Sequence, residues 1–303
     1  MLQTDFLDKK FSNPIVLASG ILGVTAASLK NAINNGCGGV TTKSVSIEPR
    51  PGHANPTMVG AKQYFINAVG LSNPGVESAV EEMKKFKQIS DSPLIGSIFA
   101  GSFDEFAQVT EKISDAPLDF LEVNISCPNV MKEFGEPFAY STQAATTITK
   151  KVKAKANVPI LIKLSPNAWN IVDIAKAVEA AGADGLVAVN TISGIAIDIY
   201  SRKPILHNKQ GGVSGPALFP IALNCVYSLA QAVKIPIIGT GGITTGEDAL
   251  AMIMAGATLL GIGSAVYFRG EDVFKKITDE MKQIMREENI KSLDEIRGCA
   301  YKN

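Results

Sequence analysis

The stretch DFLEVNISCPN, residues 119–129, changes character halfway along its length. Its first part, 120–125, is rich in apolar residues and predicts a buried strand. The second part is polar and contains a single thiol, that of Cys127, directly before a proline. The stretch therefore predicts a strand of a central sheet whose carboxyl end is polar. Cys127 is either a small residue packed at that end or a reactive group.

Seven other runs rich in Val, Ile and Leu resemble this strand. The eight predicted strands are 14–19, 39–44, 93–99, 119–125, 158–164, 185–190, 235–240 and 259–264. Helical patterns alternate with them at 28–35, 77–89, 103–114, 141–155, 170–181, 218–232, 246–255 and 271–287. Nearly continuous apolar strands are typical of a parallel sheet that is buried on both faces.

Eight alternating units predict an α/β fold, a (β/α)8 TIM barrel, rather than an open doubly wound sheet. The first predicted strand is not followed by the G-x-G-x-x-G pattern of dinucleotide-binding sheets. A length of 303 residues is ordinary for one barrel, so we expect a single domain spanning 1–303.

The composition narrows the class of function. Lys plus Arg and Asp plus Glu each number 29, which is unlike the basic surface of a nucleic-acid-binding protein. No apolar run approaches the roughly 18 residues of a membrane span, and the first 13 residues lack the order of a signal peptide. The four cysteines are scattered without a C-x-x-C pair, so we expect no metal site and a cytoplasmic location. Cys37, Cys225 and Cys299 are expected to be structural.

Three predicted connections are longer than is usual between strands and helices: 45–76, 126–140 and 191–217. Each follows a strand, so in a barrel all three leave from the carboxyl-terminal face. Because barrel active sites are built on that face, we expect the three long loops to cover a pocket there.

Glycine-rich segments follow the last two predicted strands. They are GTGG at 239–242 and GIGS at 261–264, and GVSGP at 212–216 is a third such segment. Glycines let backbone N–H groups approach an anion, and these two loops are the usual phosphate site of this fold. The alternative is a pair of tight turns without a ligand. Thr244 or Thr245 is expected to cap the helix that follows.

Two lysines, Lys43 and Lys163, interrupt otherwise apolar strand ends. One alternative is that each ammonium reaches the rim and stays solvated. The other is that it lies, as a fixed cation, against an electron-accepting ring or a carboxylate. A flavin fits the second alternative, because reduced flavin carries negative charge that a fixed ammonium stabilises. With phosphate-binding glycines across the barrel and no dinucleotide pattern, FMN is favoured over FAD or NAD.

Four asparagines, Asn67, Asn124, Asn129 and Asn190, fall in the long loops or at strand ends. Each amide offers two donors and an acceptor, which suits a flat heterocycle with several polar edges. Turn formation is the alternative at each position.

Six motifs together resemble those of class 1 dihydroorotate dehydrogenases, and most closely the 1B type. They are NAVGLSNPG (67–75), NISCPN (124–129), VPILIKLSPN (158–167), GLVAVNT (185–191), GGVSGPAL (211–218) and PIIGTGGI (236–243). The similarity runs from about residue 13 to about residue 270 in the family's order. The chain departs from the family's pattern at Ser97, where relatives carry an asparagine.

The resemblance implies a barrel with FMN at its carboxyl-terminal face that oxidises dihydroorotate to orotate in pyrimidine (UMP) biosynthesis. Cys127 matches the catalytic base that removes the C5 proton while a hydride passes from C6 to flavin N5. The positions that match the substrate pocket are Lys43, Asn67, Val69, Gly70, Leu71, Asn124, Asn129, Asn190 and Thr191. Those that match the FMN site are Ala18, Ser19, Gly20, Lys43, Ser44, Asn124, Lys163, Val189, Gly215, Gly241, Gly242, Gly263 and Ser264.

The 1B resemblance also implies a partner subunit with FAD and a 2Fe–2S cluster that passes electrons to NAD. A homodimer of this chain would then form the core of a heterotetramer. The alternatives are the 1A type, which uses fumarate, and another FMN barrel dehydrogenase that acts on a dihydropyrimidine. Class 2 enzymes use a serine base and an N-terminal helical extension, so Cys127 and the short N-terminus favour class 1.

Overall fold

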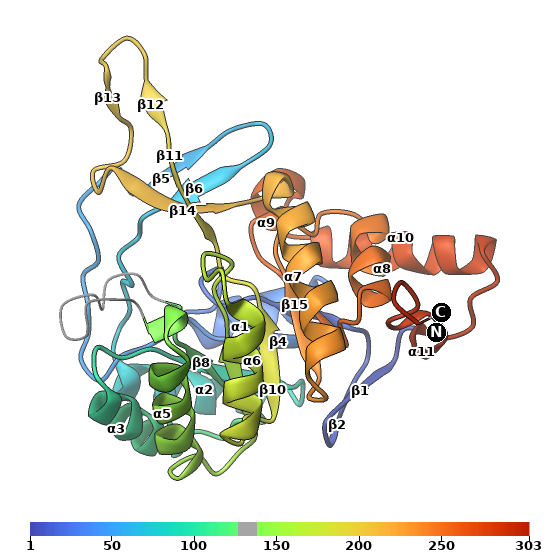
Figure 1. The fold of residues 1–303 in the computed structure, drawn as a ribbon, viewed down its shortest axis with the longest axis horizontal. Helices are drawn as coiled ribbons and strands as arrows, with labels where there is room; N and C mark the ends of the chain where they lie inside the picture. The colour runs from blue at the N-terminus through green and yellow to red at the C-terminus, as the bar shows by residue number, and fades with distance from the viewer. Residues whose placement is uncertain (127–137, 303) are drawn as a thin grey trace.

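Eight parallel strands close into a barrel in the computed structural model, which describes residues 1–126 and 138–302 (Figure 1). The order around the barrel is β10-β15-β16-β3-β4-β7-β8-β9. The strands are β3 (Ile15–Leu17), β4 (Gly39–Thr41), β7 (Leu94–Ile98), β8 (Phe120–Asn124), β9 (Ile160–Lys163), β10 (Gly185–Ala188), β15 (Ile237–Thr240) and β16 (Leu259–Ile262). Each lies inside a predicted run, so the (β/α)8 prediction is confirmed.

A helix follows each barrel strand, either directly or after a long connection. These helices are α1 (Ala26–Asn34), α2 (Val76–Ile89), α3 (Phe103–Ile113), α5 (Thr142–Lys153), α6 (Ile171–Ala180), α7 (Phe219–Ala232), α8 (Gly246–Met254) and α10 (Val273–Glu287). Side chains cap several of them, for example Ser102 at α3 and Ser141 at α5. Four short helices were not predicted: η2 (Phe138–Tyr140), η3 (Pro216–Leu218), α9 (Ala265–Arg269) and α11 (Leu293–Ile296).

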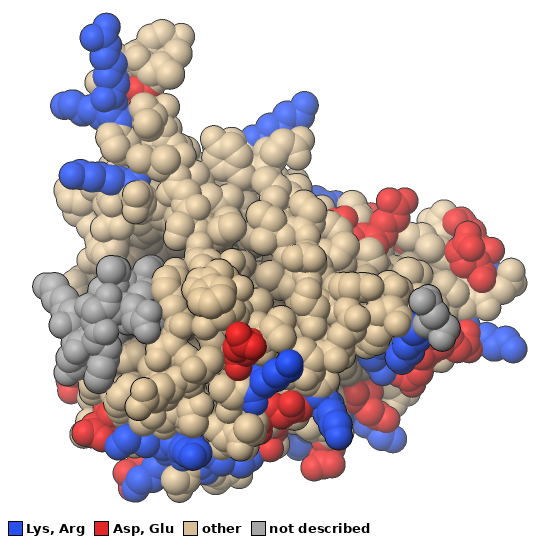
Figure 2. All heavy atoms as spheres, viewed as in Figure 1, with Lys and Arg blue, Asp and Glu red and all other residues tan. Residues whose placement is uncertain are grey.

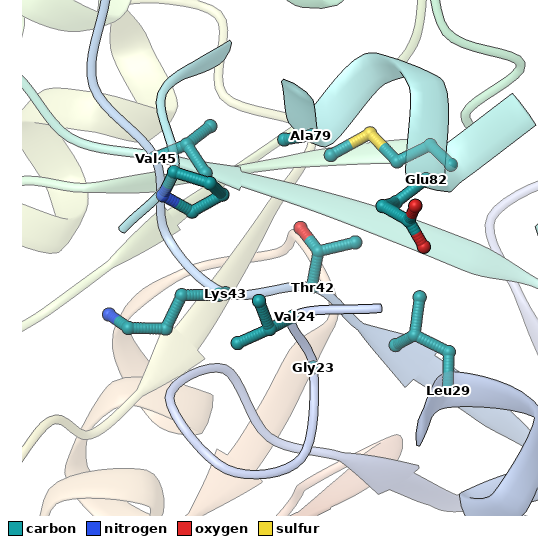
Figure 3. Close-up of a pocket in the computed structure, with 10 residues that line it drawn as sticks. Gly23, Val24, Leu29, Thr42, Lys43, Val45, Ala79 and Glu82 are labelled. Atoms are coloured by element: carbon teal, nitrogen blue, oxygen red, sulfur yellow. The ribbon is translucent and has the colours of Figure 1, made fainter. Parts of the chain in front are cut away.

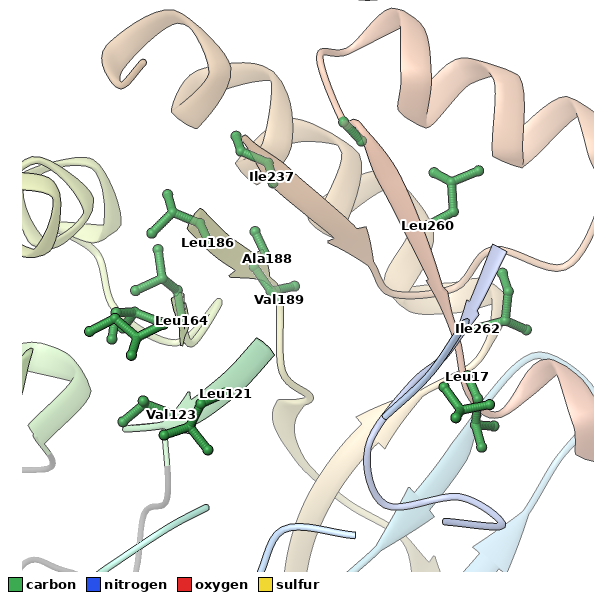
Figure 4. Close-up of a cluster of buried hydrophobic side chains, with 14 of the residues drawn as sticks. Leu17, Leu121, Val123, Leu164, Leu186, Ala188, Val189, Ile237, Leu260 and Ile262 are labelled. Atoms are coloured by element: carbon green, nitrogen blue, oxygen red, sulfur yellow. The ribbon is translucent and has the colours of Figure 1, made fainter. Parts of the chain in front are cut away.

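The main hydrophobic core lies between the barrel and these helices. On β8, Leu121 and Val123 belong to this core and are buried, and Leu186 on β10 and Leu260 on β16 belong to it as well (Figure 4). Successive residues of a strand point to opposite faces, so the intervening positions of each strand face the barrel interior.

An antiparallel hairpin packs against one end of the barrel interior. It consists of β1 (Thr4–Phe6) and β2 (Lys9–Phe11), whose Phe6 and Phe11 are fully buried. The Phe6 ring meets the inward-facing Phe120 edge-on, with ring centroids 5.4 Å apart. The inward residues that share this cluster are Val16, Ile95, Phe120, Leu161, Val187, Ile238 and Leu259. No strand was predicted before residue 14, and the hairpin corrects that prediction.

A second sheet, of four antiparallel strands, rises from the carboxyl-terminal side of the barrel (Figure 1). Its strands, in spatial order, are β11 (Ile192–Ile195), β14 (Gln210–Ser214), β6 (Phe65–Asn67) and β5 (Met58–Gly60). The predicted long connections 45–76 and 191–217 supply the four strands of this sheet, which the sequence analysis did not assign. Of the connection 126–140, only Ser126 and η2 are described.

A narrow arm extends the four-stranded sheet away from the barrel. It contains β12 (Ile197–Asp198) paired with β13 (Lys203–Pro204). Figure 2 shows positive side chains at the tip of this arm, whereas charges of both signs mix along the lower and right edges of that view. Within the described residues, no helix is long and apolar enough to cross a membrane.

The first prediction concerns the hairpin. Phe6→Ala would leave a cavity beside Phe11 and Phe120, so we expect it to lower the free energy of unfolding by about 3–5 kcal/mol. The measurement is urea unfolding followed by circular dichroism. Tyr200→Ala is the matched control, because Tyr200 is 90% exposed, and should change stability by less than about 0.5 kcal/mol. Equal effects of the two substitutions would show that the hairpin does not close the interior.

Candidate active site

The barrel interior changes from apolar to polar towards the carboxyl ends of the strands. Each of β7, β8 and β9 carries a polar residue two positions after its inward-facing apolar residue. These polar residues are Ser97, Glu122 and Lys163. Their exposed fractions are 0%, 3% and 5%, so all three are buried. Charged side chains are seldom buried unless they are paired, so this layer requires specific contacts.

Those contacts form one connected network. The Lys163 ammonium donates to Ser19 Oγ at 2.8 Å and lies 3.6 Å from Glu122 Oε1. Ser97 Oγ donates to the same carboxylate oxygen at 2.7 Å and lies 2.8 Å from Ser44 Oγ. The structure thus connects three predicted cofactor residues, Ser19, Ser44 and Lys163, through two residues to which the sequence analysis gave no role.

A cluster of amides lies at the ends of β8 and β10. Ser126 Oγ donates to Asn124 Oδ1 at 2.5 Å, and Asn190 Nδ2 donates to Ser126 Oγ at 2.6 Å. Asn190 Oδ1 in turn accepts from the Thr191 backbone N–H at 2.7 Å. Asn124 is the register partner of Lys163, so the cluster adjoins the buried network. The predicted substrate residues Asn124, Asn190 and Thr191 therefore lie together.

Ser126 is a residue that sequence reasoning missed, although it lies inside the NISCPN motif. Its position two residues after Asn124 is the spacing at which an asparagine side chain bonds its own backbone, and Ser126 N donates to Asn124 Oδ1 at 3.2 Å. Cys127 and Asn129, predicted from the same motif, lie outside the described residues.

Lys43 is half-buried just beyond β4, and its backbone N–H donates to Gly23 O at 2.8 Å. In Figure 3 its side chain extends away from Leu29 and Glu82. Lys43 and these two residues all help to line a cavity of about 10 Å³, next to α1 and α2. A space of this size holds at most about one water molecule, so this cavity is no ligand site.

The segment 67–75 connects the four-stranded sheet to α2. Asn67 on β6 pairs with Gly212 on β14, and a Cβ at Gly212 would lie 2.0 Å from Thr191 Oγ1. Because Gly212 has no side chain, Thr191 can pack directly against the backbone that pairs with Asn67. Farther along, Gly70 and Leu71 both have left-handed backbone conformations, with φ of +74° and +59°.

The turn at 69–71 is held from both sides. The Val69 carbonyl accepts from the His53 backbone N–H at 3.1 Å, and a Cβ at Gly70 would meet His53 at 2.6 Å. Asn73, which received no role in the sequence analysis, is buried and accepts from the Ser46 and Gly75 backbone N–H groups. Asn73 therefore ties the turn to the segment that follows β4.

The glycine-rich segments after β15 and β16 present unused donors. These two strands are neighbours, and Thr240 pairs with Gly261. Within the described residues, the backbone N–H groups of Gly241, Gly242, Gly263 and Ser264, just beyond these strands, donate no hydrogen bond. The Thr240 hydroxyl beside them is buried and also has no partner there. Such a group of donors suits an anion, as the sequence predicted.

The glycines of this region serve two purposes. A Cβ at Gly242 would lie 2.4 Å from Phe219 N, so this position brings the loop against the start of α7. By contrast, a Cβ at Gly20 would meet nothing within 4 Å, which leaves open space above the backbone after β3. Thr245 caps α8 through its hydroxyl, as expected.

The remaining predicted cofactor positions frame the same end of the barrel. The Ala18 N–H donates to Ile262 O at 2.9 Å, and the Val189 N–H donates to Thr240 O at 2.7 Å. Gly215 has φ of +89° and follows β14. Ala18 and Val189 thereby extend the barrel's hydrogen bonding beyond the strand ends.

The described cysteines divide into two kinds. Cys37 and Cys225 are buried, and burial raises the pKa of each thiol; for Cys37 a hydrogen bond with the Leu17 backbone opposes the effect. A raised pKa leaves little reactive thiolate at neutral pH, which supports a structural role for both. Cys299 is exposed, so burial gives no support to the structural role expected for it.

These features define a (β/α)8-barrel protein with a polar, cation-bearing site at the end of the barrel where this fold builds active sites. A family model described as dihydroorotate dehydrogenase matches residues 1–285, and the chain belongs to that family.

Curated relatives match the chain along nearly its whole length. A protein of Methanocaldococcus jannaschii is 45% identical over 99% of this chain and 98% of its own length. A protein of Pyrococcus abyssi is 45% identical over the whole of both chains, and one of Methanosarcina mazei is 42% identical over 96% and 93%. All three are named dihydroorotate dehydrogenase B (NAD(+)), catalytic subunit. The resemblance drawn from the motifs is confirmed.

The second prediction concerns thiol reactivity. At pH 8, iodoacetamide should modify Cys299 within minutes while Cys37 and Cys225 stay unmodified, because their thiolates form only at higher pH. Peptide mass spectrometry measures each site separately. Labelling in urea is the control, in which all three thiols should react. Rapid native modification of Cys37 would contradict its assignment as a packed residue.

Proposed function

We propose that this chain is the FMN-binding catalytic subunit of a dihydroorotate dehydrogenase and oxidises dihydroorotate to orotate in pyrimidine biosynthesis. The observation that carries the proposal is the presence of three groups at one end of the barrel. They are a buried ammonium on β9, amides at the ends of β8 and β10, and N–H groups after β15 and β16 that have no partner among the described residues. We assign the function to one barrel domain spanning 1–303.

FMN fits the donors that these residues offer. The N–H groups after β15 and β16 suit a phosphate, and the Thr240 hydroxyl, which has no partner among the described residues, lies next to them. Lys163 supplies a cation for the ring, which is negatively charged when reduced. The proposed cofactor residues are Ala18, Ser19, Gly20, Lys43, Ser44, Asn124, Lys163, Val189, Gly215, Gly241, Gly242, Gly263 and Ser264. When bound, FMN supplies at N5 the acceptor for the hydride that leaves C6 of dihydroorotate.

The substrate is proposed to contact the amides and the turn at 69–71. Ser126 holds the side chains of Asn124 and Asn190 in fixed orientations, so their remaining polar groups are preorganised for a flat ring. The proposed substrate residues are Lys43, Asn67, Val69, Gly70, Leu71, Asn124, Asn129, Asn190 and Thr191. Lys43 is assigned to both ligands.

Removal of the proton from C5 of dihydroorotate is assigned to Cys127 as the base. Cys127 follows Ser126 directly in the sequence. A thiol acts as a base in its thiolate form, so the reaction requires a pH at which that form is populated. The anchoring of Ser126 to two asparagines fixes the chain immediately before this residue.

We further propose that the electrons pass to NAD through a partner subunit that carries FAD and a 2Fe–2S cluster. The curated relatives are named catalytic subunits of NAD(+)-type enzymes, which supports a separate partner. The four cysteines of this chain are scattered, so the cluster thiolates are assigned to the partner. We place a homodimer of this chain at the core of a cytoplasmic heterotetramer, and the free thiols of Cys37, Cys225 and Cys299 support a reducing compartment.

The third prediction tests the substrate and the electron acceptor. Anaerobic mixing of the FMN-loaded protein with dihydroorotate should bleach the flavin's visible absorbance, whereas dihydrouracil should not, because it lacks the carboxylate. Co-expression with the partner should give NAD-linked turnover. A colourless protein that gains no colour with added FMN would refute the flavin assignment. Fumarate-linked turnover by the isolated chain would replace the 1B assignment with 1A.

The fourth prediction concerns Cys127. Cys127→Ala should leave FMN and orotate binding unchanged but slow flavin reduction by about 10²–10⁴-fold, because a general base is lost. Cys127→Ser should also be slow at neutral pH and recover as the pH rises, since a hydroxyl is a much weaker acid than a thiol. Stopped-flow absorbance across a pH series measures both. The matched control is Cys299→Ala, which removes an exposed thiol and should reduce at the parent rate. Reduction at the parent rate in Cys127→Ala would exclude the cysteine as the base.

A further inference from the structure

Glu122 is a carboxylate buried inside the barrel, directly below the amide cluster. It is 3% exposed and lies two residues before Asn124 on β8, on the same inward face as Phe120. Burying a carboxylate in a protein interior is unfavourable unless it is both paired and hydrogen-bonded. Its position above an apolar layer therefore calls for a specific role.

The neighbouring strand β7 supplies a hydrogen bond to this carboxylate. Ser97, its register partner on β7, donates a hydrogen bond to Oε1 at 2.7 Å. Since a serine hydroxyl has one hydrogen, Ser44 Oγ donates to Ser97 in the 2.8 Å contact between the two hydroxyls. The Ser97 backbone N–H donates to Thr42 Oγ1, which holds Ser97 in place. The carboxylate is thus held by a chain of hydroxyls that begins near β4.

On its other side Glu122 faces Lys163. The Lys163 ammonium is 3.6 Å from Oε1, which is an ion pair without a hydrogen bond. Its one hydrogen bond within the described residues goes to Ser19 Oγ. An ammonium has three donors, so Lys163 keeps donors for a ligand while the carboxylate balances its charge.

We propose that Glu122 is a positioning residue that orients the Lys163 ammonium and offsets its charge, and so sets the reduction potential of the bound flavin. This inference rests on the proposed function, in which FMN lies against Lys163. An unbalanced ammonium would stabilise the negatively charged reduced flavin more strongly than the balanced pair does. Glu122 therefore keeps the potential lower than Lys163 alone would make it.

The fifth prediction uses Glu122→Gln, which keeps the side chain's size and its hydrogen bond from Ser97 but removes the charge. In the FMN-loaded protein, the ratio of reduced to oxidised flavin at a fixed solution potential should rise about tenfold. For a two-electron couple this corresponds to about 30 mV in midpoint potential. The measurement is anaerobic titration against a reference dye, and an unchanged or lowered potential would overturn the proposal.

The matched control is Glu77→Gln, the same substitution in an exposed ion pair with Lys112. It should leave the potential at the parent value, because solvent screens a surface charge.

A second comparison uses Lys163. Lys163→Met should lower the potential of the flavin, because it removes the positive charge. The double variant, Glu122→Gln with Lys163→Met, should have a higher potential than Lys163→Met, because it also removes the negative charge. The double variant leaves neither charge buried alone, so it keeps the test available if Glu122→Gln does not fold.

Urea unfolding without flavin separates this inference from the proposed function. It is measured on the parent protein, Glu122→Gln, Lys163→Met and the double variant. Because removing one partner strands the other charge, the two single substitutions should together destabilise the protein more than the double substitution does. If none of the proteins binds FMN, the proposed function fails while this coupling still reports on the ion pair. Additive effects on unfolding would show that Glu122 does not act on Lys163.

Discussion

The closed parallel arrangement of the eight barrel strands is the constraint on which the rest of this structure depends. Each strand is hydrogen-bonded on both sides, and all eight deliver their carboxyl ends to the same rim. Segments that are distant in sequence therefore meet at this rim. The Lys163 bond to Ser19 joins positions 144 residues apart, across strands separated around the barrel by several others.

The barrel interior divides the work of stability and chemistry between its two ends. At one end, Phe6 and Phe11 of the N-terminal hairpin join a ring of apolar residues from the strands. At the other end, the same strands present Ser97, Glu122 and Lys163. The apolar end stabilises the fold through burial, so the polar end is free to hold charges that are unfavourable in isolation. Hydrogen bonds donated by Ser44, Ser97 and Lys163 then keep the buried network in one arrangement.

The sequence predicted regular elements well where their pattern was local. All eight barrel strands lie within the predicted runs, because strands buried on both faces carry nearly continuous apolar residues. The hairpin at 4–11 was missed since its short strands mix charged residues with phenylalanines. The sheet formed by β5, β6, β11 and β14 was missed because β14, QGGVS, has few strand-forming residues. Its two hairpins, β5–β6 and β11–β14, become one sheet only because β14 pairs with β6, more than a hundred residues earlier in the chain.

The sequence by itself determined the alternating strand and helix units, the polar strand ends and the family. These follow from periodicity and from residues at known distances along the chain. Only the tertiary structure decided that Glu122 is paired with Lys163 and bonded by Ser97, and that Ser126 connects Asn124 to Asn190. The physical reason is that each of these contacts depends on strand register and on the closure of the barrel. Register is set by the packing of all eight strands together, which no single stretch of sequence contains.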